Sequence, residues 1–241
     1  VLPHLGGYQL NELDPYKIVQ WQAILERKGS AKKKPLGPSG RRDGLIVLSG
    51  CLKEAKRNGF IPTNPVELVD WPPVHRARAI RPIPLSVVEG MRADLLLRND
   101  RRSAALISVL TYGLRPGEAL ALEWADVTDR TILVDKSSSF RVIKETKNRR
   151  HRSVRVSPAL KAELQELKRH TKILSKHVFV LKNGRPWGTT AWDNWRRMVW
   201  DKLKERHGVD QTPYALRHTF ATLLVYAGNV RHEVAEQMGD S

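Results

Sequence analysis

The chain has 241 residues, with 42 lysines and arginines against 25 aspartates and glutamates, and its formal net charge is +17. Hydrophobic residues make up 41% of it, which excludes a disordered acidic chain and allows buried cores. A positive excess of this size predicts a polyanionic partner, usually nucleic acid.

Two further features bear on where such a protein works. No apolar run reaches the roughly 20 residues that a membrane span needs, so we expect no membrane partner. The single cysteine, Cys51, excludes an internal disulfide and favours a reducing, cytoplasmic location. Its spacing from the leucines around it predicts a small core residue. Because the chain begins with Val1 rather than methionine, we expect an N-terminal piece to be missing.

Residues 1–74 predict a small all-helical domain. Asp14 followed by Pro15 is typical of a helix N-terminus, and apolar residues then recur at helical spacing. A basic connector is expected over residues 29–42, and a second helix is expected to end at Gly59.

A short third helix is expected to begin at Asn64 and to lead into a basic, proline-rich linker over residues 75–84. Proline disfavours helix both at its own position and at the one before it, so we place the domain boundary in this segment.

Residues 85–241 predict an α+β domain that is mainly helical with a small antiparallel sheet. Ser86 and Glu89 match a capping box that begins its first helix. Helices are expected over about 86–98 and 101–112, after residues 115 and 157, and in two or three further segments before 238. Short strands rich in β-branched residues are expected over 131–134, 140–143, 153–156 and 177–181. The spacing of Trp192, Trp195 and Trp200 predicts core packing.

Three segments carry candidate chemistry. In the first, Arg115 precedes Pro116, so its backbone is held outside the helical region at a helix entrance, where free N–H groups also favour an anion. In the second, residues 141–155, seven basic side chains stand against one acidic one, which predicts a β-hairpin that lies on a DNA backbone. In the third, Tyr214 and Arg217 share one face of a helix.

Together these segments resemble the catalytic domain of the tyrosine recombinases, the phage integrase family. "TYGLRPGEALALEWADV" is similar to the motif of the first catalytic arginine, "TKNRRHRSVRV" to the β-hairpin lysine motif, and "TPYALRHTFATLLVYAG" to the H-x-x-R helix. "VAEQMGDS" is similar to the segment that carries a further His or Trp. Upstream, "LPHLGGYQLNELDPYKIVQWQAIL" and "LSGCLKEAKRNGFIPTNPVELV" resemble the SAM-like core-binding domain of integrases. The resemblance covers nearly the whole chain.

The resemblance implies site-specific DNA recombination, the integration or excision of a phage or mobile element, through a 3′-phosphotyrosine intermediate. By position, Arg115 and Arg217 would hold the scissile phosphate and Lys147 would protonate the leaving 5′-oxygen. Two arginines and one lysine can stabilise this transfer without metal or cofactor, so none is expected. The basic residues expected to contact DNA are Lys32, Lys33, Lys34, Arg41, Arg42, Arg76, Arg78, Arg141, Lys144, Arg149, Arg150 and Arg152.

Two positions depart from the family pattern. Tyr214 stands where the family usually has histidine, and a phenol is a poorer proton shuttle near pH 7. Asp240 occupies the later His or Trp position, where a carboxylate would repel a phosphate unless it is protonated or paired.

The nucleophilic tyrosine of the family follows this last motif, and none of the chain's five tyrosines does, so we expect it beyond Ser241. Tyr226 is expected to pack rather than attack. The chain alone is therefore expected to bind DNA without cleaving it.

The resemblance also implies a C-shaped clamp around duplex attachment sites and a homotetramer on DNA when the protein is full length. The chain alone is expected to be monomeric, and accessory DNA-bending or directionality factors are possible partners. Two other functions stay open: a DNA-binding protein that kept the clamp but lost catalysis, and a generic basic RNA- or chromatin-binding protein.

Overall fold

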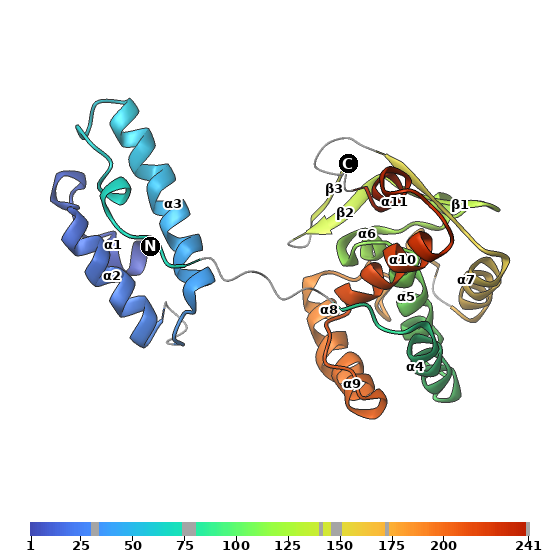
Figure 1. Cartoon of the computed structure of the whole chain (residues 1–241). Coiled ribbons are helices and arrows are strands. Elements are labelled where there is room, and N and C mark those ends of the chain that lie inside the picture. The colour runs from blue at the N-terminus through green and yellow to red at the C-terminus, as the bar shows by residue number, and fades with distance from the viewer. Residues whose placement is uncertain (30–33, 74–80, 140–141, 146–150, 172–173, 240–241) are drawn as a thin grey trace. The chain divides into compact units, whose positions relative to one another are not determined.

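The computed structural model describes residues 1–29, 34–73, 81–139, 142–145, 151–171 and 174–239. The chain forms two compact units, Val1–Arg78 and Ala79–Ser241 (Figure 1). Each unit has its own hydrophobic core.

Every regular element described in the first unit is a helix. These are α1 (Leu2–Leu5), the 3₁₀ helix η1 (Leu10–Glu12), α2 (Pro15–Lys28), α3 (Pro38–Arg57) and the 3₁₀ helix η2 (Pro65–Leu68). As expected, the Asp14 carboxylate accepts the backbone N–H of Lys17 at 2.7 Å and begins α2. Asn64 caps η2 in the same way, accepting the N–H of Val66 at 3.1 Å.

Two expectations for this unit are wrong. α3 begins at Pro38, inside the predicted connector, because proline at the first helical position starts the helix early. Cys51 is exposed. The buried stripe of α3 is Leu45, Leu48, Leu52 and Ala55, and Cys51 lies at the edge of that stripe.

The second unit is mostly helical with two antiparallel strand pairs, which confirms the predicted α+β class. Its helices are α4 (Leu85–Leu97), α5 (Arg101–Thr111), α6 (Pro116–Ala121), the 3₁₀ helix η3 (Trp124–Asp126), α7 (Pro158–His170), α8 (Thr189–Trp195), the π-helical turn η4 (Arg196–Trp200), α9 (Asp201–His207), α10 (Tyr214–Tyr226) and α11 (Arg231–Met238). Its strands are β1 (Thr131–Val134), β2 (Lys136–Ser139), β3 (Val142–Glu145) and β4 (Arg152–Arg155).

The strand pairing differs from the predicted hairpin. In the described part of the chain, β3 pairs with β2, with Lys136 opposite Glu145, and β4 pairs with β1, with Thr131 opposite Arg155. The serine-rich strand β2 was not expected, because serine has low strand propensity. In the described part of the chain, the strand predicted over residues 177–181 forms only isolated bridges. Val178, Phe179 and Val180 are buried, whereas Leu181 is exposed.

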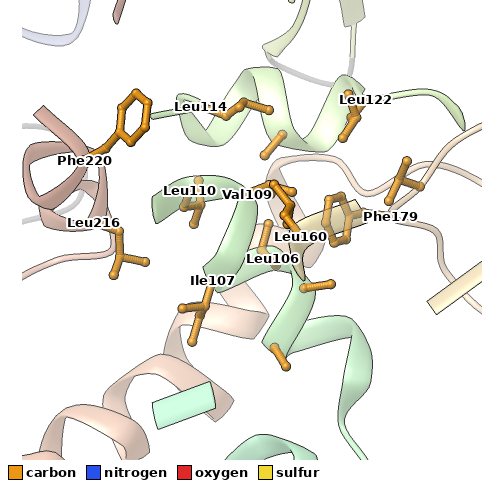
Figure 2. Close-up of a cluster of buried hydrophobic side chains, with 14 of the residues drawn as sticks. Leu106, Ile107, Val109, Leu110, Leu114, Leu122, Leu160, Phe179, Leu216 and Phe220 are labelled. Atoms are coloured by element: carbon orange, nitrogen blue, oxygen red, sulfur yellow. The ribbon is translucent and has the colours of Figure 1, made fainter. Parts of the chain in front are cut away.

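Helix α5 lies at the centre of the core of the second unit. All residues from Ser103 to Thr111 are buried, and α4, α6, α7 and α10 pack against this helix. Figure 2 shows Leu106, Ile107, Val109 and Leu110 of α5 among leucine and phenylalanine side chains of the surrounding elements.

The tryptophans of α8 and η4 pack as expected. Trp195 and Trp200 are buried, and Trp192 is partly buried against the same core. The prediction of a capping box at Ser86 and Glu89 is wrong. Helix α4 begins after Pro84, and Glu89 pairs with Arg92 instead.

Candidate phosphate-binding site

Arg115 stands at the N-cap of α6 in the extended conformation that Pro116 imposes (φ −71°, ψ 150°). Its backbone N–H donates to Glu118 Oε2 at 2.8 Å, and its Nη1 donates to Glu118 Oε1 at 2.9 Å. Its Nη2 donates to the carbonyl oxygen of Gly239 at 3.0 Å. The side chain is 36% exposed, so it lies at the surface side of the site.

Glu118 is the buried carboxylate around which this site is built. Its side chain is 2% exposed, and it also accepts both terminal nitrogens of Arg152, at 2.9 and 2.5 Å. A bidentate pair of this kind is among the stronger charge-assisted interactions.

The two arginines decide the ionisation of this carboxyl group. Burial raises the pKa of Glu118, but the hydrogen bonds and charges of Arg152 and Arg115 outweigh burial, so the pKa lies below its ordinary 4.5. Glu118 is therefore an anion near neutral pH.

Arg217 lies beneath the surface, on the first turn of α10, and is 1% exposed. Its guanidinium donates to the carbonyl oxygens of Gly113 and Met238. Although 102 residues separate Arg217 from Arg115 in the sequence (217 − 115 = 102), both side chains reach the same turn at the end of α11.

The C-terminal turn of α11 receives three arginines. Arg152 Nε donates to Gln237 O at 3.1 Å, Arg217 donates to Met238 O, and Arg115 donates to Gly239 O. The last carbonyls of a helix lack intrahelical donors and carry its negative dipole end, so cations are favoured there. The result is a cluster of three guanidinium groups held by one carboxylate and by main-chain carbonyls.

Gly113, at the junction of α5 and α6, allows two of these arginines to approach one carbonyl oxygen. It has φ +87°, and its carbonyl accepts from both Arg217 and Arg152. A Cβ at this position would lie 2.5 Å from the ring of Phe220. Only glycine fits this conformation without displacing α10.

Tyr214 and His218 lie on the same helix as Arg217. Tyr214 is 37% exposed, and its ring meets that of His218 edge-on, with 5.3 Å between centroids. Tyr226, expected to pack, is the last residue of α10 and is 84% exposed.

Several of the predicted site residues lie outside the described residues: Lys32, Lys33, Arg76, Arg78, Arg141, Lys147, Arg149, Arg150 and Asp240. Lys144 is in β3, opposite Ser137. In the first unit, Lys34 is exposed, Arg41 pairs with Glu26 at 3.0 Å, and Arg42 lies over the Trp71 ring.

Arg152, for which a direct DNA contact is predicted, has a side chain that is 9% exposed, and its donors are bonded within the protein. Sequence reasoning assigned Glu118 no role. The sequence did contain a signal for Glu118, since an acidic residue three positions after an N-cap residue is typical of a reciprocal cap.

Among the described residues, no group of three or more His, Cys, Asp or Glu side chains could hold a metal ion. In the same part of the chain, no helix is both long and apolar enough to cross a bilayer.

The family model for the phage integrases matches residues 95–241, a range that includes Arg115, Glu118, Arg152 and Arg217. The chain belongs to the phage integrase family. It is thus a tyrosine recombinase by descent, as the sequence motifs predicted.

Two curated members of this family are similar over most of the chain. Tyrosine recombinase XerD of Corynebacterium glutamicum is 28% identical over 232 residues, which cover 89% of this chain and 71% of that protein. Prophage integrase IntR of Escherichia coli is 28% identical over 225 residues, which cover 81% of this chain and 53% of that protein.

Solved integrase structures share the fold. The Tn1549 transposon integrase, in complex with transposon right end DNA, matches with a TM-score of 0.75 at 19% identity, over 98% of this chain and 80% of that one. A lambda integrase tetramer bound to a Holliday junction matches with a TM-score of 0.69 at 14% identity, over 95% of this chain and 65% of that one.

Proposed function

We propose that this chain forms part of a site-specific recombinase that cuts and rejoins duplex DNA during integration or excision of a phage or mobile element. The observation that carries the proposal is the convergence of Arg115 and Arg217 on the end of α11. Two arginines fixed by a buried scaffold are suited to a phosphodiester, whose two non-bridging oxygens accept such donors.

In this mechanism Arg115 and Arg217 bind the scissile phosphate and stabilise the charge that develops on it during transfer. Arg115 exchanges its bond to the neutral Gly239 carbonyl for one to an anionic oxygen. The Arg115 guanidinium is charged in both cases, but only the bond to DNA also has an ionised acceptor. Bonds between two ionised groups are the stronger ones, so the exchange favours DNA. Lys147 protonates the leaving 5′-oxygen, and a tyrosine attacks to form a 3′-phosphotyrosine bond.

The remaining roles follow the same proposal. Residues 1–74 act as a core-binding domain and residues 85–241 as the catalytic domain, joined by the linker 75–84. The basic residues for which a DNA contact was expected, apart from Arg152, neutralise phosphates along the duplex. The full-length protein works on DNA as a homotetramer in the bacterial cytoplasm, with accessory bending or directionality factors.

The phosphate contact can be tested by methylphosphonate interference. A duplex selected from a random pool with the whole chain is resynthesised with one uncharged methylphosphonate at each position in turn. We expect one phosphate whose substitution weakens binding of the wild type but not of Arg115→Ala. Arg169→Ala is the control, because Arg169 is an exposed arginine of α7 that pairs with Glu166. If every position behaves alike in wild type and Arg115→Ala, Arg115 does not bind a phosphate.

None of the tyrosines in residues 1–241 is placed as a nucleophile in this proposal. Tyr112 is hydrogen-bonded to Ser157, and Tyr214 shares a helical face with Arg217. Tyr8 and Tyr16 belong to the first unit. We therefore expect no protein–DNA adduct that survives SDS when the chain is incubated with a nicked duplex of the selected sequence. An adduct would identify one of these tyrosines as the nucleophile.

The alternative is a sequence-specific DNA-binding protein that has lost catalysis, and the tyrosine at position 214 favours it. A protein extended beyond Ser241 separates the two. In an active enzyme, Lys147→Ala costs about 10²–10⁴ in cleavage rate, the range of a general acid, and a 5′-thio leaving group restores the rate. Sequence-specific binding without any cleavage by the extended protein would favour the alternative.

A further inference from the structure

Arg152 occupies the centre of the arginine cluster, although its sequence context predicts a DNA contact. It is the first residue of β4. Its two terminal nitrogens bind the two oxygens of Glu118 in parallel, and its Nε donates to Gln237 O. Nη2 also lies 3.5 Å from Gly113 O. One planar guanidinium thus joins β4, α6, the α5–α6 junction and the end of α11.

Two of the three partners of Arg152, Glu118 and Gly113, also hold one of the two proposed phosphate ligands each. Glu118 accepts the backbone and side chain of Arg115. Gly113 accepts from Arg217. Gln237 belongs to the same turn as the two carbonyls that receive Arg115 and Arg217, and a Cβ added to Gly239 would lie 3.1 Å from Arg152. The packing around Arg152 is therefore continuous with that of the site.

We propose that Arg152 is a positioning residue: it holds the Glu118 carboxylate and the end of α11 in the arrangement that orients Arg115 toward a phosphate. The inference rests on the proposed function in one respect only, which is that the ligand of Arg115 is a DNA phosphate. Arg152 itself touches no substrate in this proposal.

The charges explain how Arg152 acts through Glu118. Both Glu118 oxygens are shared, each accepting one bond from Arg115 and one from Arg152. Without Arg152, a buried carboxylate would keep a single cation, and a buried charge draws its remaining partner closely. Arg115 would then turn onto Glu118 and leave the α11 turn. A lysine could restore the charge but not the two parallel bonds.

The whole chain, with its arginine Nε labelled with ¹⁵N, provides a direct test. Arg115 is identified by the resonance that Arg115→Lys removes. We compare wild type, Arg152→Met, Arg152→Lys and the control Arg155→Met. Arg155 is exposed on the same strand and faces the opposite side, since β4 alternates.

In the DNA-free protein we expect the Arg115 resonance to shift in Arg152→Met, to shift less in Arg152→Lys, and to stay in place in Arg155→Met. The pH midpoint of the Glu118 carboxyl carbon should rise in Arg152→Met, because burial is then opposed by Arg115 alone. If Arg152→Met does not fold by circular dichroism, Arg152→Lys decides. Unchanged Arg115 and Glu118 signals in both variants would overturn the inference.

Adding the selected duplex separates this inference from the proposed function. In wild type, DNA should shift the Arg115 resonance; in Arg152→Met that response should be lost, while overall affinity falls less than about tenfold because many other phosphate contacts remain. A different outcome is that DNA leaves the wild-type Arg115 resonance unchanged while Arg152→Met still shifts that resonance in the free protein. In that case the positioning role holds and the phosphate proposal fails. A normal Arg115 response to DNA in Arg152→Met would overturn the positioning role.

Discussion

The two units bury different kinds of polar side chain. Among the described residues, the first unit buries only the uncharged Gln22 and Asn64, and both amides bond to backbone. The second buries the ionisable side chains of Glu118, Asp126, His177 and Arg217.

Burial of charge is expensive, since removing an ion from water costs several kcal/mol that only good geometry offsets. A stable helical unit does not need it, as the first unit demonstrates with a core of leucine, isoleucine and tryptophan. The second unit therefore accepts a cost in stability, and Glu118 and Arg217 place part of that cost in the arginine cluster. This difference predicts how mutations at comparable positions will behave in the two units.

The largest effect is expected at Glu118. Glu118→Leu leaves the charge of Arg152 buried without its carboxylate, and breaking a buried pair in this way costs about 3–5 kcal/mol of unfolding free energy. Gln22→Leu in the first unit should cost at most about 1 kcal/mol, since it removes one neutral bond of 3.4 Å. Hydrogen exchange of the amides of each unit, as a function of urea, measures the two values separately.

A double variant sharpens this comparison. Adding Arg152→Met to Glu118→Leu removes a cation that has lost its partner, so part of the lost stability should return. Additive losses in the double variant would mean that the two side chains do not form one energetic unit, and the contrast between the two units would fail.

The next effect concerns two glycines with the same left-handed backbone. Gly113→Ala introduces both backbone strain at φ +87° and an overlap with Phe220. Together these should lower the unfolding free energy by about 2–4 kcal/mol. Gly59, after α3 in the first unit, has φ +76° with nothing within 4 Å, so Gly59→Ala should cost about 1–2 kcal/mol. Equal losses in thermal unfolding would show that the approach of α10 to Gly113 is not tight.

Local signals in the sequence predicted local structure well. Asp14, Asn64 and Ser157 each accept a backbone N–H at the helix start where they were expected, because a cap depends only on neighbours in sequence. The extended conformation of Arg115 followed from Pro116 in the same way. Exposure was harder to predict: Cys51 and Tyr226 have apolar neighbours in sequence, but both side chains are exposed.

The candidate site shows the limit of such reasoning. The residue types of Arg115 and Arg217 were sufficient to nominate them. The bond between Glu118 and Arg152 joins residues 34 apart, and the remaining acceptors are main-chain carbonyls at the end of α11. Every residue has a main-chain carbonyl, so no sequence pattern predicts which carbonyl accepts a side-chain hydrogen bond. For the same reason, the sequence did not predict that Arg152 is enclosed.

Acidification should reveal the same contrast with a smaller effect. The folded pKa of Glu118 lies below its ordinary 4.5, so its contribution to stability is present above pH 4.5 and is lost as pH falls through the folded pKa. The difference in Tm between wild type and Glu118→Gln should therefore be greatest above pH 4.5 and should shrink below it. Thermal unfolding from pH 6 to pH 3 measures this. A constant difference would mean that Glu118 does not titrate with the pKa shift described.

The smallest effect is expected at Cys51, in the first unit. Its side chain is exposed on α3, so Cys51→Ser should change the unfolding free energy by less than about 0.5 kcal/mol, as surface substitutions generally do. Its neighbour Leu52 is 1% exposed, and Leu52→Ala should cost about 2–5 kcal/mol through the cavity it leaves. One residue thus separates solvent from core because α3 presents a narrow apolar stripe. A thiol reagent gives an independent measurement, since Cys51 should react in native protein at a rate close to that in urea. Slow reaction in the native state, together with a loss of several kcal/mol in Cys51→Ser, would show that another part of the protein covers this face of α3.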